Sequence, residues 1–185
     1  IYGSGNGKVG ALIADKGVPA WEEPITVAKG ATDLARIIDV DATPIVDNGT
    51  IYAIAYNGQL VAMELRSGRT LWKREYASFR AMAVEDNVLY VVDSVGKMYA
   101  IDARSGLENW AQLVLNRHCV TAPTVYKKYI VVGDAEGNLH WFDIWIKLVI
   151  RNIDSFKHSY ILLKKLSRRI LVRPSLDTVQ IISKR

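Results

Sequence analysis

Short runs in which apolar and polar residues alternate follow one another along most of the chain. Alternation with a period of two is typical of β-strands that bury one face, because successive side chains point to opposite faces. Asn57-Gly58, between two such runs, predicts a type I′ hairpin turn, whose two central residues both have positive φ. The runs around this turn predict four strands, at residues 44–46, 50–55, 59–64 and 70–72.

The same arrangement recurs with a fixed spacing. A turn glycine is followed ten residues later by a second glycine and fourteen residues later by a tryptophan, in the sets Gly7-Gly17-Trp21, Gly58-Gly68-Trp72 and Gly96-Gly106-Trp110. Four short antiparallel strands in about 40 residues are the content of one β-propeller blade. The next two units predict strands at 81–84, 88–93, 98–102 and 107–110, and then at 122–126, 129–133 and 139–142.

The repeated tryptophans predict how the blades pack. A four-stranded sheet cannot bury both faces alone, so blades stack face to face. An indole buries a large area and can direct its N–H to a nearby carbonyl. We therefore predict an all-β chain, a β-propeller fragment of three to four blades over residues 1–143. The residues expected to dock one blade on the next are Trp21, Trp72, Trp110, Gly17, Gly68 and Gly106.

Residues 144–185 depart from this pattern. All 13 glycines lie at or before Gly137, and the fourth unit has Lys147 and Arg151 where the repeat predicts Gly and Trp. One interpretation is an irregular basic tail with an amphipathic helix near residues 156–170, suited to an anionic membrane surface. The other is that the segment is out of frame, so that the last blade is incomplete.

Charge is divided unevenly between these two parts. Residues 1–143 carry 14 Lys and Arg against 17 Asp and Glu, whereas residues 144–185 carry 10 against 2. The body is therefore mildly acidic, and the net charge of +5 gives no support to a nucleic-acid surface.

Motifs of nucleotide binding, metal binding and nucleophilic catalysis are missing from the sequence. His118, Cys119, His140 and His158 lack the spacing of a zinc site. The glycine-rich start, residues 3–7, lacks the Lys-Ser/Thr of a phosphate-binding loop and predicts a hairpin turn. We therefore predict no metal and no cofactor.

Two strings carry a family resemblance, Ala62–Trp72 and Ala100–Trp110. They resemble the docking motif Ala-x-Asp-x-x-Thr/Ser-Gly-x-x-x-Trp of the quinoprotein-like β-propeller superfamily. That superfamily includes dehydrogenases that use pyrroloquinoline quinone, as well as cofactor-free scaffolds. A dehydrogenase needs a calcium site and an acidic base near the propeller axis, and neither can be assigned here. A fragment of such an enzyme and a basic membrane-surface protein stay open as alternatives.

A closer resemblance covers roughly residues 1–143. The segments 36–44, 55–58, 65–68, 71–75 and 132–137 resemble the BamB family of outer-membrane β-barrel assembly lipoproteins. The resemblance implies an eight-bladed, non-enzymatic scaffold of a Gram-negative bacterium. It implies a location at the periplasmic face of the outer membrane, tethered through a lipidated cysteine upstream of this chain. The implied partners are the barrel-assembly protein BamA, the rest of its complex, and unfolded outer-membrane protein clients.

The candidate site lies in the longest connection. The spacing between turn glycines is 51 residues from Gly7 to Gly58, against 38 for the next unit, and the excess includes residues 28–33. Enlarged loops on rigid scaffolds often carry function. This loop leads to Arg36 and to Asp39-Val40-Asp41, whose two carboxylates share a side if the segment is extended, where they could receive Arg or Lys from a partner.

The resemblance implies that Asp39 and Asp41 belong to the surface that contacts BamA, with Arg36 beside them. The alternative is that the two carboxylates cap a turn or pair locally with Arg36.

Overall fold

The computed structural model describes residues 1–27, 38–56, 58–113, 115, 120–144, 149–154, 170–175 and 178–183. All regular secondary structure in these ranges is β-strand. The first sheet contains β1 (Tyr2–Gly3), β2 (Lys8–Ile13) and β3 (Val18–Pro24), and the second contains β4 (Ile45–Asp47), β5 (Thr50–Ala55), β6 (Gln59–Glu64) and β7 (Thr70–Glu75).

Two further four-stranded sheets and one hairpin follow. The third sheet contains β8 (Ala83–Glu85), β9 (Val88–Val92), β10 (Met98–Asp102) and β11 (Glu108–Gln112). The fourth contains β12 (Thr124–Tyr126), β13 (Tyr129–Gly133), β14 (Asn138–Asp143) and β15 (Val149–Asp154), and the hairpin contains β16 (Ile170–Ser175) and β17 (Thr178–Ser183). The strands predicted between residues 44 and 142 are confirmed, with bounds that differ by no more than three residues.

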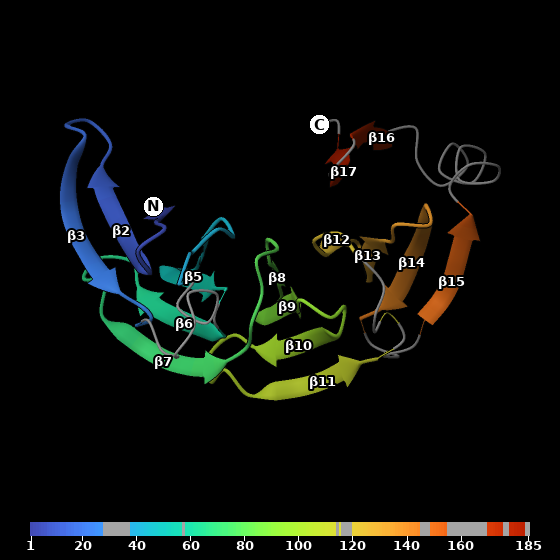
Figure 1. Cartoon of the computed structure of the whole chain (residues 1–185), viewed down its shortest axis with the longest axis horizontal. Coiled ribbons are helices and arrows are strands. Elements are labelled where there is room, and N and C mark those ends of the chain that lie inside the picture. Colours follow the sequence, from blue (N-terminus) through green and yellow to red (C-terminus); the bar gives the residue numbers. More distant parts are fainter. Residues whose placement is uncertain are drawn as a thin grey trace.

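The four larger sheets follow one another along an arc (Figure 1). In every one the strands pair antiparallel in sequence order, so that β3, β7, β11 and β15 lie along the outer side of the arc. The short strands β8 and β12 lie toward the inside, and β8 contacts both β4 and β12. This is the arrangement of consecutive propeller blades around a common axis, and the predicted fold class is confirmed.

One turn differs from the prediction. Ala55 pairs with Gln59, so the connection between β5 and β6 has three residues where a type I′ turn has two. A three-residue hairpin loop needs only its last residue in the left-handed region, and Gly58 fills that place with φ +100°. Two-residue turns with both φ positive lie instead at Asn48-Gly49, between β4 and β5, and at Asp86-Asn87, between β8 and β9.

Each sheet has an irregularity at the same place. Between the last two strands of each of the four larger sheets, the register shifts directly after the pairs Ala11↔Trp21, Ala62↔Trp72, Ala100↔Trp110 and Trp141↔Arg151. A β-bulge at a fixed point re-aims the side chains beyond it. In the first three blades the small alanine therefore leaves room beside the large indole of the neighbouring strand.

Two of the indoles, Trp21 and Trp72, lie against the neighbouring blade. Trp21 donates its Nε1 hydrogen to the carbonyl of Leu65 at 3.1 Å, and Trp72 donates to Ala103 at 3.0 Å. The Trp21 ring covers Gly68 so closely that a Cβ there would lie 2.6 Å from it, and Trp72 covers Gly106 at 2.7 Å. Both glycines also have φ +72°, which disfavours any other residue.

The other two residues predicted to dock blades, Gly17 and Trp110, have different surroundings. Gly17 adopts φ +64°, but nothing lies within 4 Å of the place of a Cβ. Trp110 is half-buried and contacts Tyr90 at a ring-centroid distance of 6.3 Å within the core between the third and fourth blades. The position predicted to receive it, Lys147, lies outside the described residues.

The fourth sheet extends past residue 143, where the sequence placed the end of the propeller. β15 pairs with β14 over its whole length, so this sheet has four strands and is not incomplete. Backbone hydrogen bonding needs neither a glycine nor a tryptophan, and Val149 and Ile150 favour a strand. The predicted helix near residues 156–170 lies almost wholly outside the described residues, and the hairpin of β16 and β17 was not predicted.

Candidate partner-binding surface

The strand connections lie on two opposite rims of the arc. Because neighbouring strands are antiparallel, the β1–β2, β3–β4, β5–β6 and β7–β8 connections meet at one rim, which we call the Asp39 rim. The β2–β3, β4–β5, β6–β7 and β8–β9 connections meet at the opposite rim. The opposite rim has short turns, whereas the long connections 25–44 and 76–82 both lie on the Asp39 rim. Long loops on a rigid scaffold are where binding surfaces concentrate.

The glycine-rich start of the chain supports the candidate segment. The Val40 N–H donates to the carbonyl of Ser4 at 3.2 Å, and the Tyr56 N–H donates to the carbonyl of Asp39 at 2.9 Å. A Cβ at Gly3 would lie 2.6 Å from Val40, so the absence of a side chain there lets the segment lie directly over the β1–β2 connection. The segment is thus tied to the first and second blades at once.

The two carboxylates differ in their surroundings, and that of Asp39 lies beside Gly5 of the β1–β2 connection. Val40 and Ala42 are buried, while Asp39 is half-buried and Asp41 is exposed. This alternation is that of an extended segment with its carboxylates on the outward side. Neither carboxylate makes a hydrogen bond or an ion pair with another residue that the structure describes. Arg36, the third predicted site residue, lies outside those residues, and so do residues 28–33 of the enlarged loop.

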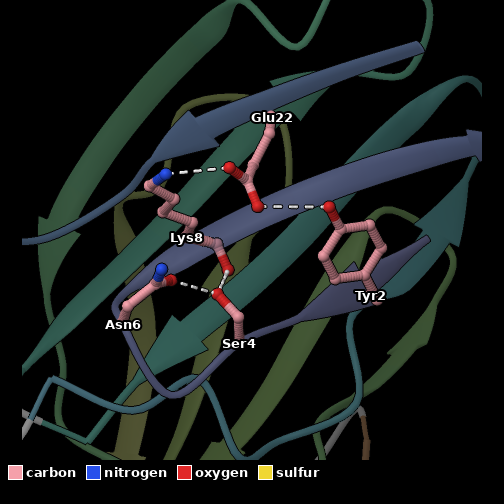
Figure 2. Close-up of polar contacts among 5 residues, drawn as sticks. All are labelled: Tyr2, Ser4, Asn6, Lys8 and Glu22. Carbon is pink, nitrogen blue, oxygen red and sulfur yellow. Dashed lines mark hydrogen bonds and ion pairs between the residues drawn. The ribbon is translucent and has the colours of Figure 1, made fainter. Parts of the chain in front are cut away.

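A polar network on the first blade holds the β1–β2 connection (Figure 2). Glu22 accepts hydrogen bonds from Lys8 at 2.8 Å and from Tyr2 at 3.2 Å, which joins all three strands of the sheet. The hydrogen bond between Lys8 and Glu22 lowers the pKa of Glu22 and raises that of Lys8. Ser4 donates to Asn6 and lies against the carbonyl of Lys8, so the residue that receives the Val40 N–H is itself fixed.

A buried acid and histidine lie at the corresponding connection of the fourth blade. Asp134 Oδ2 lies 2.7 Å from His140 Nε2, and Asp134 Oδ1 accepts the Asn138 N–H at 2.8 Å. Burial acts to raise the pKa of Asp134, but the hydrogen bonds from Asn138 and His140 outweigh it, so that this pKa lies below that of an ordinary aspartate. The pair fastens the start of β14 to the β13–β14 connection, which is a structural role.

The described ranges contain no cluster of three His, Cys, Asp or Glu side chains placed to hold a metal ion. His118, Cys119 and His158 lie outside those ranges. No helix suited to spanning a membrane occurs among the residues whose structure is described.

Three other residues on the Asp39 rim had no role assigned from the sequence. Tyr56 and Phe79 are aromatic residues with their rings partly in solvent, and Arg80 lies beside Phe79. The sequence signal for such a surface residue is a bulky aromatic side chain at a predicted turn. A residue of this kind is equally typical of a buried core, so the sequence alone does not distinguish the two.

Comparison with known proteins places the chain in a family. Residues 1–112 match the family described as outer membrane protein assembly factor BamB. The chain belongs to the BamB family. The outer membrane protein assembly factor BamB of Moranella endobia is 41% identical over 182 residues, which are 98% of this chain and 44% of that protein.

Solved structures agree with this membership. The crystal structure of BamB from Moraxella catarrhalis matches with a TM-score of 0.76 and 27% identity, over 82% of this chain and 46% of that chain. A quinohemoprotein alcohol dehydrogenase from Comamonas testosteroni matches with a TM-score of 0.52 and 24% identity, over 62% and 21% of the two chains. The latter likeness shows only the shared propeller fold. The present chain thus spans under half the length of its BamB relatives.

Proposed function

We propose that the protein is a non-enzymatic scaffold of the outer-membrane protein assembly machinery that binds the barrel-assembly protein BamA through the Asp39 rim. The relatives are named as assembly factors, and that name supports the role in assembly. The same relatives support an outer-membrane location, and we propose that the propeller faces the periplasm. Further proposed partners are the other subunits of that complex and unfolded outer-membrane protein clients.

One observation carries the proposed binding site. Asp39 and Asp41 stand on a segment that two backbone hydrogen bonds fix across two blades, with Val40 buried between them. A carboxylate on a fixed backbone loses little conformational entropy when a partner binds. Little of the favourable interaction energy with a cationic group is therefore offset by ordering. Arginine suits this geometry best, because its planar guanidinium can bind a carboxylate through two parallel hydrogen bonds.

Capture of purified BamA by the full-length protein tests the proposal. The double variant Asp39→Arg/Asp41→Arg replaces both carboxylates by cations, and we expect the affinity to fall by at least about tenfold, as for loss of charge pairs at other interfaces. The matched control is Asp15→Arg/Glu85→Arg, which makes the same change of charge at two exposed positions of the opposite rim. Equal capture by the two double variants would remove the site from the Asp39 rim.

A further inference from the structure

The Asp39 rim carries an exposed aromatic pair. Tyr56, in the β5–β6 connection, is 39% exposed as a residue, and Phe79, in the β7–β8 connection, is 43% exposed. Their ring centroids lie 6.2 Å apart with the planes inclined by 31°. The two rings therefore bring the second and third blades together at one apolar spot, although neither ring contributes to a described core cluster.

The residues on either side of Phe79 are anchored. Ser78 is buried and donates to the carbonyl of Val92 at 2.6 Å, and its oxygen accepts the Arg80 N–H at 3.0 Å. The Arg80 side chain donates to the carbonyls of Asp93, at 2.9 Å, and of Val120. Its guanidinium also lies 4.3 Å from the centroid of the Phe79 ring.

These contacts fix the chain on either side of Phe79 and place the Arg80 guanidinium against its partly exposed ring. A mobile surface phenylalanine would need no such support, since single exposed apolar residues are common. Aromatic residues that are rigid before binding lose little side-chain entropy when a partner covers them, and such residues dominate the energy of many interfaces.

The aromatic pair is continuous with the acidic segment. The backbone N–H of Tyr56 is the group that donates to the carbonyl of Asp39, so the two features share one hydrogen-bonded junction. An apolar centre bordered by charged groups is the usual anatomy of a protein interface. The junction therefore combines an aromatic anchor with two outward carboxylates on a single rim.

We propose that Tyr56 and Phe79 form the apolar anchor of the surface whose charged part is Asp39 and Asp41. This inference rests on the proposed function, and it specifies the partner's chemistry: BamA presents there an apolar side chain with a basic residue beside it. The rings cover the apolar side chain, while the carboxylates bind the basic residue.

The test compares dissociation constants of the full-length protein and BamA. For Tyr56→Ala/Phe79→Ala we expect a loss of about tenfold or more, the size typical of truncated aromatic anchors. Phe79→Leu keeps an apolar side chain and is expected to retain most of the affinity. The matched control is Leu71→Ala/Leu107→Ala, which removes two leucines that are 47% and 61% exposed on the opposite rim. Because all four positions are exposed, circular dichroism is expected to show folded protein in each case.

The outcomes separate this inference from the proposed function. If Asp39→Arg/Asp41→Arg weakens binding while Tyr56→Ala/Phe79→Ala matches its leucine control, the aromatic anchor is overturned and the proposed function stands. If the unaltered protein does not bind BamA, the proposed function and the aromatic anchor are both wrong. Weaker binding of BamA by Tyr56→Ala/Phe79→Ala, together with affinity that Phe79→Leu retains, supports the aromatic anchor.

Discussion

The indole ring of Trp72 occupies the space that a Cβ on Gly106 would need, at a separation of 2.7 Å. The two residues belong to neighbouring blades, and the same relationship joins Trp21 to Gly68. A repeated contact of this kind joins three successive small sheets into a packed stack, so that no blade has to be stable alone.

Replacing Gly106 by alanine is expected to destabilise the protein by about 2 kcal/mol or more, through backbone strain together with displacement of a packed ring. Gly49→Ala is the matched control, because its φ of +76° is similar but nothing lies within 4 Å of a Cβ there. That control should cost only about 1 kcal/mol, from the backbone alone. Denaturant unfolding measures the free energy of unfolding of both variants. Equal losses of stability would mean that the Trp72 ring does not pack tightly on Gly106.

Truncating Trp72 tests the indole itself. Trp72→Ala empties the space between the second and third blades and is expected to cost about 3–5 kcal/mol. Trp72→Phe keeps most of the apolar ring but loses the hydrogen bond to Ala103, for a smaller loss of about 1–2 kcal/mol. The midpoints of denaturant unfolding should fall in that order. Identical midpoints for Trp72→Ala and the unaltered protein would contradict inter-blade docking.

The acid stability of the fourth blade should depend on Asp134. Its lowered pKa means that the folded state favours the charged carboxylate, through Asn138 and His140. This contribution is fully present above the ordinary pKa of an aspartate, and it is lost as the pH falls through the lowered value. Asp134→Asn cannot titrate, so its melting temperature should fall less steeply than that of the unaltered protein between about pH 5 and pH 2. Parallel curves would show that Asp134 does not stabilise the fold in this way.

Much of the fold could be predicted because its signals are local. Strand alternation, turn glycines and the spacing to each tryptophan predicted β4 to β14 closely, and Arg151 does stand at the repeat position of the docking tryptophan. β15 was missed because its pairing with β14 depends on backbone groups, which leave no mark in the sequence once Gly and Trp are replaced. The idea that residues beyond 144 are out of frame stays a prediction, although the alignment with the Moranella endobia relative takes in 98% of the chain.

The candidate site was only partly accessible to the same reasoning. The sequence left open whether Asp39-Val40-Asp41 is extended or caps a turn, and the buried Val40 and Ala42 have the alternation of an extended segment. The support from Gly3 and Ser4, more than 30 residues earlier, depends on how two blades meet and could not be foreseen. The same holds for Tyr56 and Phe79, which come together from two different connections.

Site-specific photocrosslinking tests the central claim most directly, namely that this rim of a tryptophan-docked propeller binds the barrel-assembly protein. A photoreactive residue at position 41 samples the Asp39 rim, and one at position 15 samples an exposed turn of the opposite rim. We expect a crosslink to BamA from position 41 and none from position 15. A crosslink from position 15 alone would contradict the account, because the partner would then lie on the other side of the propeller.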